Sequence, residues 1–140
     1  MRKIFLLVLL AAGAASCGSG KAGKARLQGV RWDAAWIRIN DSASFDRPDP
    51  LPFLIFTSDS TISGNTGCNG FAGRYTVDDN DKITLSVEAV TMIICMEVET
   101  EQTYLEQLQM AERYSLRGDT LVLSDPGNVP QIKFIKNKIE

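Results

Sequence analysis

The stretch "SGNTGCNGFAGRY", residues 63–75, decides the fold, because it repeats glycine at every third position around a cysteine. The residues concerned are Gly64, Gly67, Cys68, Gly70 and Gly73. A phosphate-binding loop would need Gly-Lys-Ser or Gly-Lys-Thr opening a helix, and a dinucleotide site would need G-x-G-x-x-G after a strand. Here no lysine follows, and the next residues, "FAGRYTV", have a strand pattern. Since glycine permits positive φ angles and close backbone approach, the stretch predicts a tight connection between strands.

The first residues of the chain are typical of an exported protein. Arg2 and Lys3 precede an apolar, small-residue run over 4–15, which is too short to span a bilayer comfortably and predicts a signal peptide over residues 1–16. The run ends in Ala14-Ala15-Ser16-Cys17, which resembles the bacterial lipobox and makes Cys17 the expected lipidation site and mature N-terminus. Ordinary cleavage after an Ala-x-Ala sequence is the alternative.

Cysteine number favours lipidation. The chain has 3 cysteines and an odd thiol in an exported protein requires an explanation. If Cys17 carries lipid, Cys68 and Cys95 remain and can pair.

The charge of the mature chain bears on its partners. Removal of the signal peptide takes away Arg2 and Lys3, which leaves 13 of the 15 basic residues (15 minus 2) against 17 acidic residues and a net charge of −4. This balance argues against nucleic acid and against electrostatic binding to anionic lipid. Membrane attachment would instead come from acyl chains on Cys17, at roughly 0.8 kcal/mol per buried methylene.

The rest of the chain predicts one domain over residues 27–138. Residues 17–26 are expected to be the lipidated N-terminus and a tether, with no regular structure in "GSGKAGKA". Short strand patterns follow, with "FLIFT" at 53–57 expected to be buried on both faces and a loop expected over 40–52. "DDND" at 78–81 predicts a hairpin turn, and 114–136 reads as a meander of three strands. One helix is expected over 97–112, with Tyr104, Leu105, Leu108 and Ala111 on its packed face and its glutamates in solvent.

Several kinds of catalytic or metal site are excluded by composition. With no histidine in the chain, histidine general bases, Cys-His pairs and His-ligated zinc are ruled out. Two cysteines do not make a tetrahedral thiolate site, and no pair of acidic residues stands out from surface turns. "DDND" also fails as a calcium loop, because no glycine or glutamate stands where an EF-hand needs them. We therefore expect no catalytic residue, no metal site and no cofactor.

The order of these features resembles the META domain, the family of HslJ-like heat-shock lipoproteins. The signature, an apolar strand, a Ser-Gly strand, Gly-Cys-Asn and aromatic-x-Gly-x-Tyr, is matched by Phe56, Ser63, Gly64, Gly67, Cys68, Asn69, Phe71, Gly73 and Tyr75. "TMIICM" fits a second family segment through Thr91 and Cys95, and Trp32 follows Leu27 and Gly29 as the family's N-terminal tryptophan does. The likeness covers about residues 27–136.

The resemblance implies an α+β fold, mostly antiparallel sheet curled into a partial barrel with one packed helix. It implies that the shared residues are structural and that the fold brings Cys68 and Cys95 together, where an oxidising compartment favours a disulfide. The alternative is a pair of buried free thiols.

These expectations combine into a function. The leading hypothesis is a lipid-anchored, non-enzymatic envelope protein, facing the periplasm from the outer membrane, that supports envelope integrity or stress tolerance by binding an unknown protein or small ligand. The alternative is a periplasmic protein inhibitor similar to the lysozyme inhibitors, since an acidic domain suits a basic target.

Overall fold

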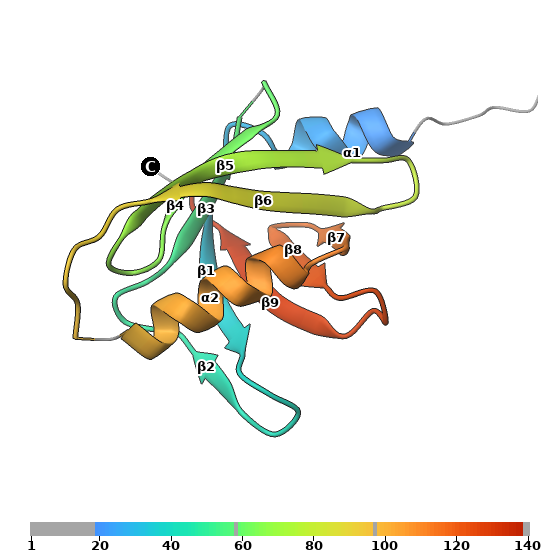
Figure 1. Cartoon of the computed structure of the whole chain (residues 1–140). Helices are drawn as coiled ribbons and strands as arrows, with labels where there is room; N and C mark the ends of the chain where they lie inside the picture. Colours follow the sequence, from blue (N-terminus) through green and yellow to red (C-terminus); the bar gives the residue numbers. More distant parts are fainter. Residues whose placement is uncertain (1–18, 58, 97, 139–140) are drawn as a thin grey trace, which may run out of the picture.

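The computed structural model describes residues 19–57, 59–96 and 98–138 (Figure 1). Nine strands and two helices follow one another along this part of the chain. They are α1 (Ser19–Leu27), β1 (Arg31–Arg38), β2 (Ser44–Asp46), β3 (Phe53–Phe56), β4 (Thr61–Asn65), β5 (Gly70–Val77), β6 (Ile83–Val90), α2 (Val98–Met110), β7 (Arg113–Arg117), β8 (Thr120–Ser124) and β9 (Pro130–Lys136).

All named strands belong to one antiparallel sheet with the order β6-β5-β4-β3-β1-β9-β8-β7, and β2 pairs with β1 beside this path. The sheet curls until its two outer strands nearly meet, where Lys82 and Arg113 form an isolated bridge. Helix α2 lies across the open side, between the β5–β6 hairpin and strands β8 and β9 (Figure 1). The expected α+β partial barrel with one packed helix is therefore confirmed.

The middle of the sheet joins the first and the last of the named strands. Strand β1 pairs with β3 on one side and with β9 on the other, with a bulge between Ala34 and Trp36. Beyond β9, the Asn137 backbone N–H donates to the Arg31 carbonyl at 2.8 Å, and its side-chain amide donates to the Asp33 carboxylate at 2.6 Å. These bonds link residues that are far apart in the sequence.

The core fills the space between the curled sheet and α2. Tyr104 and Leu108 point inward from α2 with no exposed surface, and the Tyr104 ring contacts Phe71 and Phe134 edge-on. Burial raises the pKa of the Tyr104 phenol well above its ordinary value, so this residue stays neutral. The predicted helix face is confirmed for these two residues, whereas Leu105 is half-buried and Gln107 is buried beside them. Ala111 is buried as expected but lies just beyond the end of α2.

Three local expectations are wrong. Residues 19–27 are helical where a structureless tether was expected, because lysine and alanine favour helix and α1 is fixed by the buried Leu27 and a bond from Lys24 Nζ to Ser60 Oγ at 2.9 Å. The expected 40–52 loop contains β2. Strand β3 is fully buried on one face only, because Phe53 and Ile55 are half-exposed.

Two further expectations depend on residues near the N-terminus. Cys17, the expected lipidation site, and the signal peptide over residues 1–16 lie outside the described residues. No helix among the described residues is both long and apolar enough to cross a membrane.

Candidate functional site

The connection between β4 and β5 is the tight turn that the glycine-rich stretch predicted. The Thr66 backbone N–H donates to the Asn69 carbonyl at 2.8 Å, and the Gly67 N–H donates to Asn65 Oδ1 at 2.8 Å. Gly67 has φ 96°, and a Cβ there would lie 2.6 Å from the Pro50 carbonyl oxygen. Glycine is thus required at position 67 both by its φ angle and by the close approach of the 48–52 segment.

The neighbouring strands approach each other closely at two more signature glycines. A Cβ on Gly64 would overlap the Phe53 carbonyl oxygen and the Phe71 ring, and a Cβ on Gly73 would overlap the Ser86 carbonyl oxygen. Both positions lie on paired strands, Gly64 opposite Leu54 and Gly73 opposite Ile62. These glycines therefore let β4 and β5 pack against their neighbours.

Asn69 organises the polar side of the turn. Its side chain is buried, and its carbonyl oxygen accepts from Thr91 Oγ1 at 2.9 Å and from the Ile93 backbone N–H at 2.7 Å. Its amide group donates to both carboxylate oxygens of Glu101, at 2.9 and 3.1 Å, and to the Ile93 carbonyl at 3.2 Å. One side chain thus ties the β4–β5 turn to the segment after β6 and to the first turns of α2.

Glu101 completes this group. Thr66 Oγ1 and the Asn69 backbone N–H also donate to its carboxylate, which lies near the N-terminus of α2, where negative charge is favourable. We call Thr66, Asn69, Thr91 and Glu101 the Asn69 cluster. The sequence offered one hint of Glu101, its place in the first turn of a helix, but four other glutamates in the same segment masked it.

A disulfide reinforces the same connection. Cys68, in the turn, is bonded to Cys95, in the segment between β6 and α2, with the two Cα atoms 6.2 Å apart. This is the pairing that the family resemblance implied. The two sulfur atoms and a Glu101 carboxylate oxygen lie within 4.8 Å of one another, but sulfurs bonded in a disulfide are not the thiolates that hold metal ions.

Between these anchors the chain exposes a run of large apolar side chains. Met92, Ile94 and Met96 are 96%, 100% and 99% exposed, and Ile93 is 64% exposed. We call residues 92–96 the Met-Ile loop. Single exposed apolar residues are ordinary, but consecutive ones in a segment held by a disulfide and a buried polar cluster are not.

A hollow lies on each side of the Met-Ile loop. The first, of about 410 Å³, is lined by the disulfide, Pro50, Met96, Asp49, Thr66 and Thr100, and we call it the Pro50 hollow. The second, of about 580 Å³, is lined by Val90, Met92, Ile94, Val98 and Glu101. The first volume is within the range of small-ligand pockets and suits one large side chain or a small molecule.

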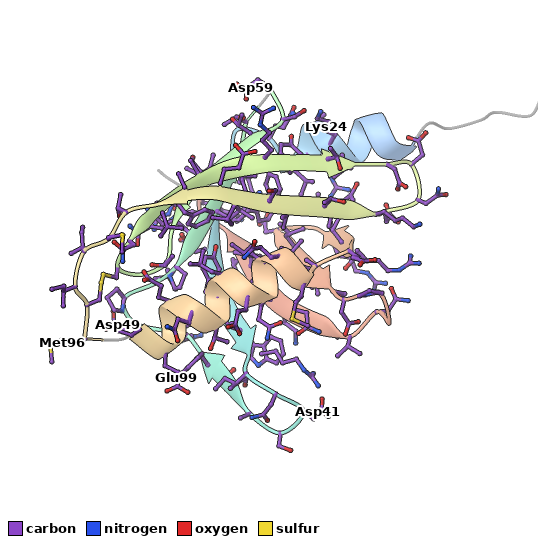
Figure 2. The ribbon with its side chains drawn as sticks, in the orientation of Figure 1. Lys24, Asp41, Asp49, Asp59, Met96 and Glu99 are labelled. Atoms are coloured by element: carbon purple, nitrogen blue, oxygen red, sulfur yellow. A yellow bond between two sulfur atoms is a disulfide. The ribbon has the colours of Figure 1, made fainter. Side chains whose placement is uncertain are left out.

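Asp49 lines the Pro50 hollow, and Glu99 lies in the first turn of α2, next to the lining residue Thr100. Figure 2 shows Asp49, Met96 and Glu99 at the same end of the molecule, with Lys24 and Asp59 at the far end. Asp49 lines the hollow and Glu99 is exposed in the first turn of α2. The site therefore combines exposed apolar side chains with negative charge.

The remaining signature residues serve the core and the sheet. Trp32, Phe56, Phe71 and Tyr75 are buried, and the Trp32 indole N–H donates to the Leu27 carbonyl at 3.0 Å. Ser63 is half-buried in β4 between Ile55 and Ala72 of the neighbouring strands. The structure thus gathers Gly67, Cys68, Asn69, Thr91 and Cys95 into the site and places the other signature residues elsewhere.

The chain was compared with protein families, with solved structures and with curated proteins. The family model described as the META domain matches residues 25–138. A protein from Burkholderia xenovorans, solved by NMR, is similar in structure with a TM-score of 0.67 at 18% identity, covering 99% of each chain. A DUF4847 family protein from Bacteroides vulgatus, solved by crystallography, covers 64% of this chain and 61% of its own with a TM-score of 0.49 at 22% identity. None of the curated proteins matches the sequence.

Proposed function

Since the chain belongs to the META domain family, we propose that it is a lipid-anchored, non-enzymatic protein of the bacterial cell envelope. In this proposal the Met-Ile loop is the surface that contacts a partner. The partner is a protein or small ligand, and the role is in envelope integrity or stress tolerance. Cys17 carries the lipid, and the domain faces the periplasm from the outer membrane.

The observation that carries the proposal is the anchored exposure of the Met-Ile loop. Burying one side chain such as Met or Ile contributes roughly 1.5–3 kcal/mol, so a loop free to move would gain by folding such side chains inward. Here the disulfide and the two Asn69 bonds to Ile93 fix the loop backbone in place. Stabilising interactions that hold apolar side chains in water favour a binding surface over incidental exposure.

The place of the loop favours a partner away from the anchoring membrane. Helix α1, which leads from the N-terminus, lies at the end of the β5–β6 hairpin where β5 finishes, and the Met-Ile loop follows β6 at the other end (Figure 1). Eight residues of β5 separate the two ends by roughly 26 Å at about 3.3 Å per residue. A lipid on Cys17 would therefore leave the Met-Ile loop accessible on the side of the domain away from the anchoring membrane.

The test of the anchor is the mass of the mature protein purified from membranes. A mature N-terminus at Cys17 carrying acyl chains is expected. An unmodified chain, or one starting elsewhere, removes the lipoprotein part of the proposal.

The test of the loop is site-specific crosslinking in intact envelopes. A photoreactive amino acid at position 94 is expected to give discrete adducts, and the same group at exposed Glu106, on α2 outside the site, is the matched control. Equal adduct patterns at both positions would contradict the proposed binding role of the loop.

A further inference from the structure

We propose that the Met-Ile loop and the Pro50 hollow bind a basic, apolar peptide segment of a partner protein, with a lysine or arginine side chain of that segment seated in the hollow. This inference rests on the proposed function and names the chemistry of the partner. It follows from the hollow, the charges near it and the side chains of the loop.

The Pro50 hollow suits a long cationic side chain. Its walls include Pro50, Met96 and the Cys68–Cys95 disulfide, which are apolar, and it has a volume of about 410 Å³. Lysine and arginine place an aliphatic stem along apolar surface while the charged head stays near water or a carboxylate. Asp49 supplies the carboxylate at the hollow, and Thr66 and Thr100 supply further polar lining.

Asp49, in the lining of the hollow, and Glu99, in the first turn of α2, form no ion pair within the part of the chain that the structure describes. The ion pairs among the described residues lie elsewhere, namely Arg31–Asp33, Arg38–Asp41, Arg74–Glu88 and Lys138–Asp119. Arg47 lines a neighbouring hollow together with Asp49 but makes no ion pair with it. Asp49 and Glu99 therefore attract a cation from outside, whereas Glu101 is occupied by the Asn69 cluster.

The loop itself selects apolar character without demanding one sequence. Met92 and Met96 have flexible, polarizable side chains that adapt to different surfaces, and Ile94 adds exposed apolar area between them. The same carboxylates repel anionic lipid headgroups, which disfavours a membrane surface as the occupant. Apolar contact with charge complementarity thus favours a peptide with leucine-like and lysine-like residues on one side.

The experiment measures binding of labelled peptides by fluorescence anisotropy. The protein is the full mature chain with Cys17→Ser, which removes the lipid, and the probes are three 14-residue peptides of leucine with lysine, glutamine or glutamate. The lysine peptide is expected to bind at least tenfold more tightly than the glutamate peptide. The preference should shrink in high salt, because screening weakens exposed charge pairs.

Variants separate the charges from the apolar loop. Asp49→Asn with Glu99→Gln should weaken lysine-peptide binding about tenfold, and Asp49→Lys with Glu99→Lys should reverse the preference toward the glutamate peptide. Glu106→Gln with Glu112→Gln removes two exposed charges away from the hollow and should change affinity less than twofold. Ile94→Ser with Met96→Ser should weaken binding of all three peptides.

Three results would overturn the inference. The first is equal affinity for the three peptides, or equal loss in the matched control. The second is loop-dependent binding to phosphatidylcholine vesicles in place of the peptides, which would identify a membrane. The third is a dimer in sedimentation that Ile94→Ser abolishes, which would identify a second copy. If crosslinking at position 94 in envelopes still gives discrete adducts, the proposed function stands while this partner class fails.

Discussion

The two ends of the β5–β6 hairpin are built from the same pair of strands but stabilised in opposite ways. At the 78–82 end, the Asp78 carboxylate accepts from the backbone N–H groups of Asn80 and Lys82 at 2.8 and 3.0 Å, within an exposed polar turn. At the 70–90 end, the chain continues into the Met-Ile loop, which a disulfide and Asn69 hold to the β4–β5 turn.

The 78–82 turn is polar and also meets β7, since the Tyr114 N–H donates to the Asp81 carbonyl at 2.9 Å and Lys82 forms a bridge with Arg113, whereas the Met-Ile loop holds apolar side chains in solvent. The 78–82 turn exposes aspartates, asparagine and lysine, which water solvates without cost. The other end uses buried polar groups and a covalent bond to hold methionine and isoleucine in solvent. The interactions at that end hold an exposed apolar segment in place. Substitutions that remove the stabilising interactions at the two ends should therefore differ in their effect on unfolding free energy.

The largest expected effect is at the disulfide. Cys68→Ser with Cys95→Ser opens a loop of sequence separation 27, and the chain-entropy estimate for a loop of this size is about 3.6 kcal/mol. Urea unfolding of the double variant and of the wild type should differ by this order, and chemical reduction of the wild type should reproduce the loss. A loss below about 1 kcal/mol would show that the noncovalent contacts alone hold the Met-Ile loop.

The next effect is at Asn69. Asn69→Ala removes the amide donor to the Glu101 carboxylate, which keeps only Thr66 Oγ1 and the backbone N–H of residue 69, and it leaves the Ile93 N–H without its acceptor. The expected loss of unfolding free energy is about 2–3 kcal/mol. Hydrogen exchange at the Ile93 amide should accelerate before global unfolding. Asn80→Ala is the matched change at the other end of the hairpin, and its expected cost is within about 0.5 kcal/mol because its side chain is exposed. Equal losses of unfolding free energy for Asn69→Ala and Asn80→Ala would contradict the proposed difference between the two ends.

A smaller effect, dependent on pH, is expected at the polar turn. The backbone N–H of Asn80, and then that of Lys82, lowers the pKa of the Asp78 carboxyl. A carboxyl with a lowered folded-state pKa stabilises the fold above its unfolded pKa of about 3.9, and this stability is lost as pH falls through the folded pKa.

Thermal unfolding of Asp78→Asn beside the wild type checks this sign. The wild type should melt at the higher temperature at pH 7, and the difference should shrink below about pH 4. A difference that stays constant down to pH 2 would contradict the role of the ionised carboxylate. Met96→Ser, at the other end of the hairpin, provides a reference without an ionisable group.

The smallest effect on stability is expected in the loop itself. Met92→Ser with Ile94→Ser alters side chains that are 96% and 100% exposed, so the unfolding free energy should stay within about 0.5 kcal/mol of the wild type. Peptide binding should nevertheless fall. A clear destabilisation by urea unfolding would mean that the loop packs against the domain and is not a presented surface.

The sequence predicted the parts of this comparison that depend on local chemistry. "DDND" indicated the polar turn through the preference of aspartate and asparagine for turns, and the glycine spacing indicated the tight β4–β5 connection. The helix and the closing meander followed from propensity and alternation. The local patterns failed at α1, which a bond from Lys24 to the distant Ser60 holds in place, and at β2, which forms a short hairpin with β1.

The site was less predictable, because its chemistry depends on long-range contacts. Cys68, Asn69, Thr91 and Cys95 came from the family signature, but Glu101 looked like any acidic residue of a solvated helix. Glu101 looked solvent-exposed but is bonded within the site, whereas Ile93 and Ile94 looked like core residues but are exposed. Apolar residues in a short run are ordinarily buried, and only the folded chain shows that Ile93 is 64% and Ile94 100% exposed.

The pairing of β1 with β9 has a consequence for how the chain is completed. Strand β1 is the first and β9 the last of the named strands, yet the two are neighbours in the middle of the sheet. A growing or truncated polypeptide that stops before Pro130 leaves the edge of β1 without its partner. The half-barrel can therefore form only after residues 130–136 have been synthesised.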